Sequence, residues 1–159
     1  MNKIKIEKNT NGDSRVATSK PDFIQFEKAN CMHCNDVDNM MSYVADRITS
    51  RGRRHDYTKK IEPHRSAFYR DLCNTIDGAM QFDDGEWSKT HYETERHHLN
   101  RHCPDDVNLI DVIEMICDCI CAGMARRGEY SPISISDEIL QKAVRNTEKM
   151  CVNAVEVIE

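Results

Sequence analysis

The sequence predicts an all-α, single-domain protein built from five or six helices. Apolar residues recur at the spacing of an amphipathic helix in several segments of the chain. Strand pairs, hairpins and internal repeats do not stand out. The length of 159 residues suits one domain, and the 39% of hydrophobic residues is enough for one modest core. Together these observations favour a small helical bundle.

The polar N-terminal region is expected to be a mobile arm over residues 1–25, followed by a helical domain over residues 26–159. Within the arm, Ile4 and Ile6 alternate with lysines, and this pattern is also compatible with a short edge strand. The helical spacing of the apolar residues then predicts a first helix over about residues 35–49.

The polar stretch over residues 50–53 is expected to interrupt or bend this first helix. Further helical segments follow, and we expect them over about residues 63–80, 87–101, 107–125 and 136–157. Asp105 or Asp106 is the expected N-cap of the segment that begins at residue 107, which is the most hydrophobic of the chain. A stretch that resembles a capping box, residues 134–137, precedes the last helix.

Composition and charge exclude several classes of protein. The net charge is −5 and the pI is near 5.8, whereas a non-specific nucleic-acid coat or an anionic-membrane binder needs a basic excess. The sequence has no run of 18 apolar residues, so we expect no membrane span. The N-terminal residues lack an apolar segment of the kind that secretory signals carry. We therefore expect a soluble, cytoplasmic protein, in the host cytoplasm if a phage encodes it.

The eight cysteines are expected to be free thiols, because the cytoplasm is reducing. Three of them lie in the most hydrophobic segment and are expected to pack as small apolar side chains: Cys117, Cys119 and Cys121. A single C-x-x-C, formed by Cys31 and Cys34 with His33 between them, could belong to a structural zinc site. The sequence offers no second ligand pair at the spacing of a zinc finger, so this is the weaker interpretation.

Three carboxylates share one stripe of the segment that begins at residue 107. At 100° per residue, Asp111, Glu114 and Asp118 fall within about 60° of one another. The apolar residues of this helix, such as Ile113 and Ile116, occupy the opposite side. The stripe is therefore either a solvated face or the floor of a cation site.

A second group of titratable residues lies over residues 91–102. One helical face would align His91, Glu95, His98 and His102, with His97 pointing about 120° away. In a single straight helix His91 and His98 would lie ~10.5 Å apart along the axis, too far to share one ion. Either the helix breaks between these two histidines or they serve different sub-sites.

An adjacent His55–Asp56 pair offers one imidazole nitrogen and one carboxylate oxygen to a cation. His33 from an earlier position and Asp118 from a later helix would complete the ligand set. Mixed nitrogen and oxygen ligation suits Mn, Fe, Co, Ni or Zn better than Ca. Open coordination positions on such an ion can take a phosphate and an activated water.

The order of these residues resembles the HD superfamily of metal-dependent phosphohydrolases, whose ligands follow the pattern H, HD, D on a helical bundle. The sequence is most similar to a small, poorly characterised HD-like family that is common in phages and bacteria. Four blocks of this sequence carry the resemblance, which covers about residues 31–125: HCNDV at 33–37, HDYTK at 55–59, HYETERHH at 91–98 and LIDVIEMICDC at 109–119.

The sequence departs from the family pattern in a few places. Thr58 replaces a serine and keeps the hydroxyl, whereas Glu95 replaces an asparagine and Cys119 replaces a tryptophan. Members of the family tend to have a glutamate after the lysine that matches Lys59. Either Glu62 or His64 takes that position in this sequence.

The resemblance implies a role for each matching residue. The primary metal ligands would be His33, His55, Asp56 and Asp118. His91, with His97 or His98, would bind a second metal ion or the charge that develops on the phosphate. The remaining site residues would be Lys59 and Arg96 as phosphate contacts, Glu62 as a general base, and Glu114 as the hydrogen-bond acceptor of a ligating histidine.

The function that this resemblance implies is metal-dependent hydrolysis of a nucleotide or a related phosphate ester, with one or two divalent transition-metal ions. The alternative is a non-catalytic module on a degenerate HD fold that binds a nucleotide or a protein. Neither interpretation requires a membrane or non-specific binding to nucleic acid. The sequence leaves open whether the chain forms a homo-oligomer.

Overall fold

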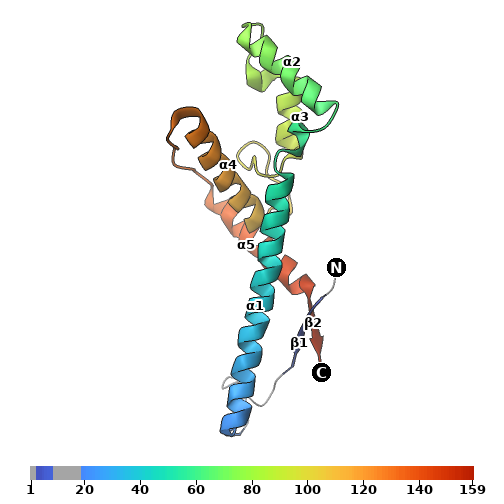
Figure 1. The fold of residues 1–159 in the computed structure, drawn as a ribbon, viewed down its shortest axis with the longest axis vertical. Helices are drawn as coiled ribbons and strands as arrows, with labels where there is room; N and C mark the ends of the chain where they lie inside the picture. Colours follow the sequence, from blue (N-terminus) through green and yellow to red (C-terminus); the bar gives the residue numbers. More distant parts are fainter. Residues whose placement is uncertain (1–2, 9–18) are drawn as a thin grey trace. The chain divides into compact units, whose positions relative to one another are not determined.

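The computed structural model describes residues 3–8 and 19–159, and this part of the chain is predominantly helical (Figure 1). The prediction of an all-α fold is therefore confirmed. The five α-helices of the described part are α1 (Phe23–Arg54), α2 (His64–Ile76), α3 (Glu86–Thr94), α4 (Leu109–Arg127) and α5 (Asp137–Ala154). The described part also contains two short 3-10 helices, η1 (Tyr57–Lys59) and η2 (Phe82–Asp84). Its two strands are β1 (Ile4–Glu7) and β2 (Val155–Ile158). None of these helices has both the length and the apolar character that crossing a membrane requires.

The contacts within the chain define two compact units. Unit 1 consists of Met1–Arg47 and Glu148–Glu159, and unit 2 consists of Ile48–Thr147. The predicted boundary between a mobile arm and one helical domain remains a prediction. Residues 23–25 of that arm are already part of α1, and residues 1–2 and 9–18 lie outside the described part of the chain.

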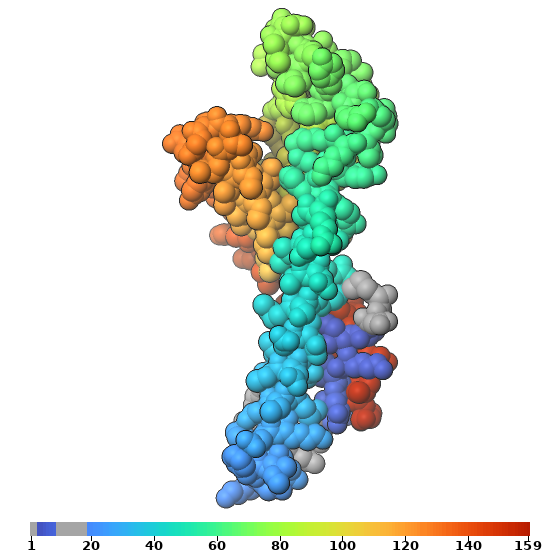
Figure 2. All heavy atoms as spheres, viewed as in Figure 1, coloured from blue at the N-terminus to red at the C-terminus, as the bar shows by residue number. Residues whose placement is uncertain are grey.

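Unit 1 contains a two-stranded parallel sheet. Ile4 pairs with Val155 and Ile6 with Val157, and the atoms of the two strands are in contact in Figure 2, where β1 is blue and β2 is red. The short strand that Ile4 and Ile6 allow is thus present. Its partner strand did not stand out in the sequence, and the predicted end of the last helix near residue 157 was wrong, because α5 ends at Ala154 and the residues after it form ladder hydrogen bonds instead.

Helix α1 is longer than the sequence predicts. The expected interruption at residues 50–53 is absent, and the helix continues to Arg54. Only Gly52 in this stretch is a weak helix former, and the arginines of the last turn interact favourably with the negative end of the helix dipole. The chain leaves the helix at Asp56, whose φ of 53° and ψ of 42° place it in the left-handed region.

The core of unit 2 lies around α4 and the first part of α5. Its buried members are Leu99, Val107, Val112, Met115 and Ala143. Helix α4 begins one residue after Asn108, which makes a capping box with Asp111, so the predicted N-caps Asp105 and Asp106 were wrong.

The cysteines are all unpaired thiols. The expectation that Cys117 and Cys121 pack in the core was wrong, because both are exposed on α4, whereas Cys119 packs against the core of unit 2. Cys31 and Cys34 are exposed on α1.

Candidate metal centre

Two groups of potential metal ligands lie in unit 2. Asp56, His91, His97 and His98 form one group, called here the three-histidine cluster, in which one potential ligand atom of each residue lies within 4.8 Å of the others. His55, His97 and Asp118 form the second, called here the His55 group, by the same criterion. His97 belongs to both groups.

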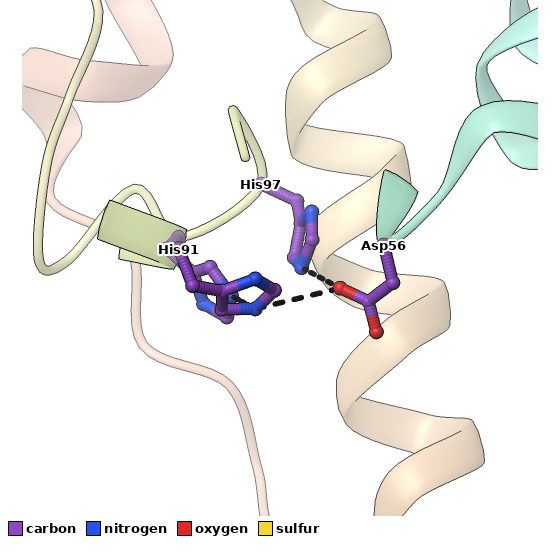
Figure 3. A group of neighbouring side chains, drawn as sticks. Asp56, His91 and His97 are labelled. Carbon is purple, nitrogen blue, oxygen red and sulfur yellow. Dashed lines mark hydrogen bonds and ion pairs between the residues drawn. The ribbon is translucent and has the colours of Figure 1, made fainter. Parts of the chain in front are cut away.

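Asp56 belongs to the three-histidine cluster and also contacts His55, and its left-handed conformation turns the chain sharply after α1. Its Oδ1 lies 3.5 Å from His91 Nε2 and 3.7 Å from His97 Nε2, and both rings point toward the carboxylate in Figure 3. Its Oδ2 lies 3.4 Å from His55 Nε2 and accepts a hydrogen bond from Lys59 Nζ. The two oxygens of one carboxylate therefore face different histidines.

The position of His91 on α3 is fixed by packing and by one hydrogen bond. Its ring stacks on Trp87 with centroids 4.4 Å apart. Its Nδ1 lies 2.7 Å from Thr58 Oγ1, which donates its one proton to Glu95 Oε1 at 2.9 Å. Because Thr58 has no second proton to donate, His91 Nδ1 is the donor in this contact, and its Nε2 carries the lone pair that faces Asp56 and His98.

His98 reaches the same point because the helix ends between the two histidines. Helix α3 stops at Thr94, and Glu95 adopts an extended conformation with φ −86° and ψ 114°. The chain then turns back, so that His98 Nε2 lies 2.8 Å from His91 Nε2. Of the two alternatives that the sequence allows, the break in the helix is the one found.

The electrostatic environment keeps two of these histidines neutral. Burial, together with the neighbouring His98, lowers the pKa of His91 to about 3, and burial, together with His97, lowers the pKa of His98 to about 4. Burial also acts to lower the pKa of His97, but the carboxylates of Glu114, Asp118 and Asp56 outweigh it and raise that pKa above its ordinary value. Neutral imidazole is the form that binds a metal ion.

Glu114 on α4 contacts two members of the His55 group. Glu114 Oε1 lies 3.1 Å from His55 Nδ1 and 3.5 Å from His97 Nδ1, while Glu114 Oε2 accepts a hydrogen bond from Arg51. His55 Nε2 faces Asp118 Oδ1 at 3.3 Å. Burial would raise the pKa of Glu114, but its contacts with His97, His55 and Arg51 bring it below the usual value. Glu114 is therefore an ionised acceptor for Nδ1 of His55, and its charge also lies close to Nδ1 of His97.

Asp111 is a buried carboxylate that holds two arginines next to the site. Its side chain is fully buried and accepts hydrogen bonds from Arg51 at 2.8 Å and from Arg96 at 2.8 and 2.9 Å. Arg96 also contacts Asp106. Asp111 and Glu114 are both buried, so the solvated-face interpretation of the acidic stripe was wrong for these two residues.

The residues present fit a divalent transition-metal ion. Metal–ligand bonds of about 2.1 Å place neighbouring ligand atoms roughly 3.0–3.4 Å apart, close to the separations found here. Asp56 Oδ1 and both ring nitrogens of His97 are buried, and within the described part of the chain they have no hydrogen-bond partner. Three imidazoles and one carboxylate are ligands that favour Mn, Fe, Co, Ni or Zn.

The charge balance also favours a cation. Around the two groups, five carboxylates face three basic side chains, so with neutral histidines the site carries a net charge of about −2. The residues counted are Asp56, Glu95, Asp111, Glu114 and Asp118 against Arg51, Lys59 and Arg96. One divalent ion would neutralise this charge.

The structure brings together most of the residues that the sequence singles out. Around the two groups lie His55, Asp56, Lys59, His91, His97, His98, Glu114 and Asp118. His33 is not among them, being exposed in the part of α1 that belongs to unit 1. Glu62 is also apart, because it is exposed and bonded to Ser66 and Arg65.

The sequence pattern did not predict which residues hold the potential ligands in place. Thr58 and Glu95 are buried neighbours of His91, although Glu95 looks only like a departure from the family pattern. Arg51 carries no signal that separates it from the surface arginines beside it. Arg96 is held by Asp111, and this placement differs from its expected contact with phosphate.

One comparison with known proteins is informative. The model of a family described as "Family of unknown function (DUF5662)" matches residues 23–156, and this range includes every residue of both ligand groups. Neither a curated protein nor a solved structure matches the chain.

Proposed function

Since the chain belongs to the DUF5662 family, whose function is unknown, we propose its function from the metal centre: metal-dependent hydrolysis of a phosphate ester, nucleotides included. The observation that carries this proposal is the three-histidine cluster. It combines neutral imidazoles, an ionised Asp56 and buried polar atoms that lack a protein partner.

A divalent ion at this site supplies Lewis-acid polarisation of the phosphate and lowers the pKa of water. The chain's own residues hold and orient the reacting groups. Lys59 uses one of its three protons on Asp56, and its side chain is about one-third exposed. Its remaining protons are available to the non-bridging oxygens of a phosphate that lies beside Asp56.

The hydrogen bonds behind the ligands support the same function. Glu95 and Thr58 hold His91, and Glu114 holds His55, so these ligand nitrogens keep a fixed direction before substrate arrives. Asp118 has about a quarter of its side chain exposed, so a carboxylate of the His55 group is accessible to solvent. This arrangement supplies the preorganisation that hydrolysis of a stable ester requires.

The test is phosphate release from a panel of nucleotides and simpler phosphate esters, with Mn, Co, Ni or Zn added to metal-free protein. The wild type should release phosphate only with metal, and Asp56→Asn should lower the rate at least about 100-fold, because Asp56 contacts both ligand groups. Asp105→Asn is the matched control, since the Asp105 side chain is fully exposed and, among the described residues, pairs with Lys142 alone. Metal-loaded wild type that releases no phosphate from any ester would contradict the proposal and favour a non-catalytic binding module.

A further inference from the structure

A cavity of about 240 Å³ opens directly onto the His55 group. It lies within unit 2, between the last turns of α1 and the exposed side of α4. His55 and Asp118 belong both to its lining and to the ligand group, so whatever occupies it contacts the metal centre. Arg51 and Glu114 also line the cavity, and the rest of the wall is apolar or weakly polar: Ile48, Gly52, Ile110, Ile113, Cys117 and Cys121.

The polar side chains of this lining bond in part to one another and to Asp111. Arg51 is bonded to Asp111 and Glu114, and Glu114 is bonded to Arg51 and His55. Among the described lining residues, the two thiols and the N–H groups of Arg51 other than those on Nη1 are left to meet a polar ligand group away from the metal. A nucleobase buried here would lose hydrogen bonds to water that this largely apolar wall replaces only in part.

We propose that this cavity binds the apolar part of the substrate, an aryl or alkyl group carried by the phosphate, and thereby favours aryl and alkyl phosphates over nucleotides. The inference rests on the proposed function, because the phosphate of the same molecule is taken to lie at the metal centre. The cavity is smaller than the pockets that hold drug-sized ligands, and it suits one ring or a short chain. Burial of that group against isoleucines supplies binding free energy without requiring a polar partner.

The test compares three ligands on manganese-loaded protein by calorimetry: inorganic phosphate, phenyl phosphate and uridine monophosphate. Phenyl phosphate should bind at least about tenfold more tightly than inorganic phosphate, because its ring is buried. Uridine monophosphate should gain no such advantage. Equal binding of phenyl phosphate and inorganic phosphate, or tightest binding of uridine monophosphate, would overturn the inference.

Two isoleucines of α4 provide matched variants. Ile113 lines the cavity and Ile116 does not, although both are 37% exposed. Ile113→Gln should abolish the preference for phenyl phosphate over inorganic phosphate, whereas Ile116→Gln should retain it. A preference that survives Ile113→Gln would contradict the inference. If Ile113→Gln does not fold, Gly52→Leu replaces it, because a Cβ at Gly52 meets no described atom within 4 Å and the larger side chain would fill the cavity.

The binding measurement separates this inference from the proposed function. A preference for phenyl phosphate that Ile113→Gln removes, without phosphate release from any ester, would uphold the apolar subsite and contradict hydrolysis. Metal-dependent release of phosphate with no preference for the ring would uphold hydrolysis and contradict the subsite.

Discussion

His91 and His98 are seven residues apart in the sequence, yet their Nε2 atoms lie 2.8 Å from each other. The end of α3 at Thr94 and the extended Glu95 bring about this approach. Two neutral imidazole nitrogens this close either share one proton or direct their lone pairs at one ion. The buried carboxylate oxygen of Asp56, 3.5 Å from His91 Nε2, favours the ion.

The first prediction concerns this pair. His98→Ala should lower the affinity for Mn or Zn by at least about tenfold, because it removes one of the ligands of the three-histidine cluster. The control is His102→Ala, which removes an exposed histidine four positions later. Metal titration of both variants by calorimetry gives the comparison. Equal affinities in the two variants would show that His98 is not a ligand.

The second prediction concerns the residue that orients His91. Thr58→Val should weaken metal binding by about 10–100-fold, because it removes the oxygen that accepts the Nδ1 proton of His91. Thr58→Ser keeps that oxygen and should bind metal nearly as well as the wild type. A Thr58→Val protein with unchanged metal affinity would exclude this orienting role.

The third prediction concerns stability. Asp111→Ala should lower the free energy of unfolding by about 2–4 kcal/mol, because it leaves two partly buried arginines without their shared carboxylate and breaks the cap of α4. Asp105→Ala removes an exposed ion pair and should cost less than about 0.5 kcal/mol. Urea denaturation of the metal-free proteins measures both values. Similar losses in the two variants would contradict the anchoring role of Asp111.

The fourth prediction concerns pH. The pKa of His98 is lowered from 6.5 to about 4 in the folded chain, so the unfolded chain binds more protons between these values. The free energy of unfolding of metal-free protein should therefore fall as pH falls from 6.5 to 5, with a contribution from His98 of up to about 1.4 kcal/mol per pH unit. His91 acts in the same direction, and His97, whose pKa is raised, acts in the opposite one.

Replacing His98 with Asn should reduce this dependence on pH, whereas His102→Asn should leave it unchanged. Urea denaturation at pH 5, 5.5, 6 and 6.5 gives the slope for each protein. An unchanged slope in His98→Asn would contradict the lowered pKa.

The helices could be predicted from sequence because their apolar residues follow the helical period, which is a local signal. The parallel pairing of Ile4 with Val155 could not, because it joins residues far apart in the chain. The C-terminal end of α1 was placed too early since a polar stretch with one glycine resembles a break, and residues 23–34 were not predicted as part of this helix.

The candidate site could be predicted in part. His55, Asp56 and Asp118 stand out by their order, and the structure places them together. His33 follows the same order but belongs to neither ligand group, because the order of residues along the chain does not fix which of them share a compact unit. The roles of Thr58 and Glu95 depend on the turn after α3. No periodic pattern in the sequence predicts that turn.

Metal content of His97→Asn, measured beside that of the wild type, tests the central claim most directly, because His97 belongs to both ligand groups. His33→Asn is the control, since His33 is exposed on α1 and lies outside both groups. We predict about one or two equivalents of a transition metal in the wild type and in His33→Asn, and a loss of at least half in His97→Asn. Full metal content in a folded His97→Asn, or its loss in His33→Asn, would contradict the metal centre described here.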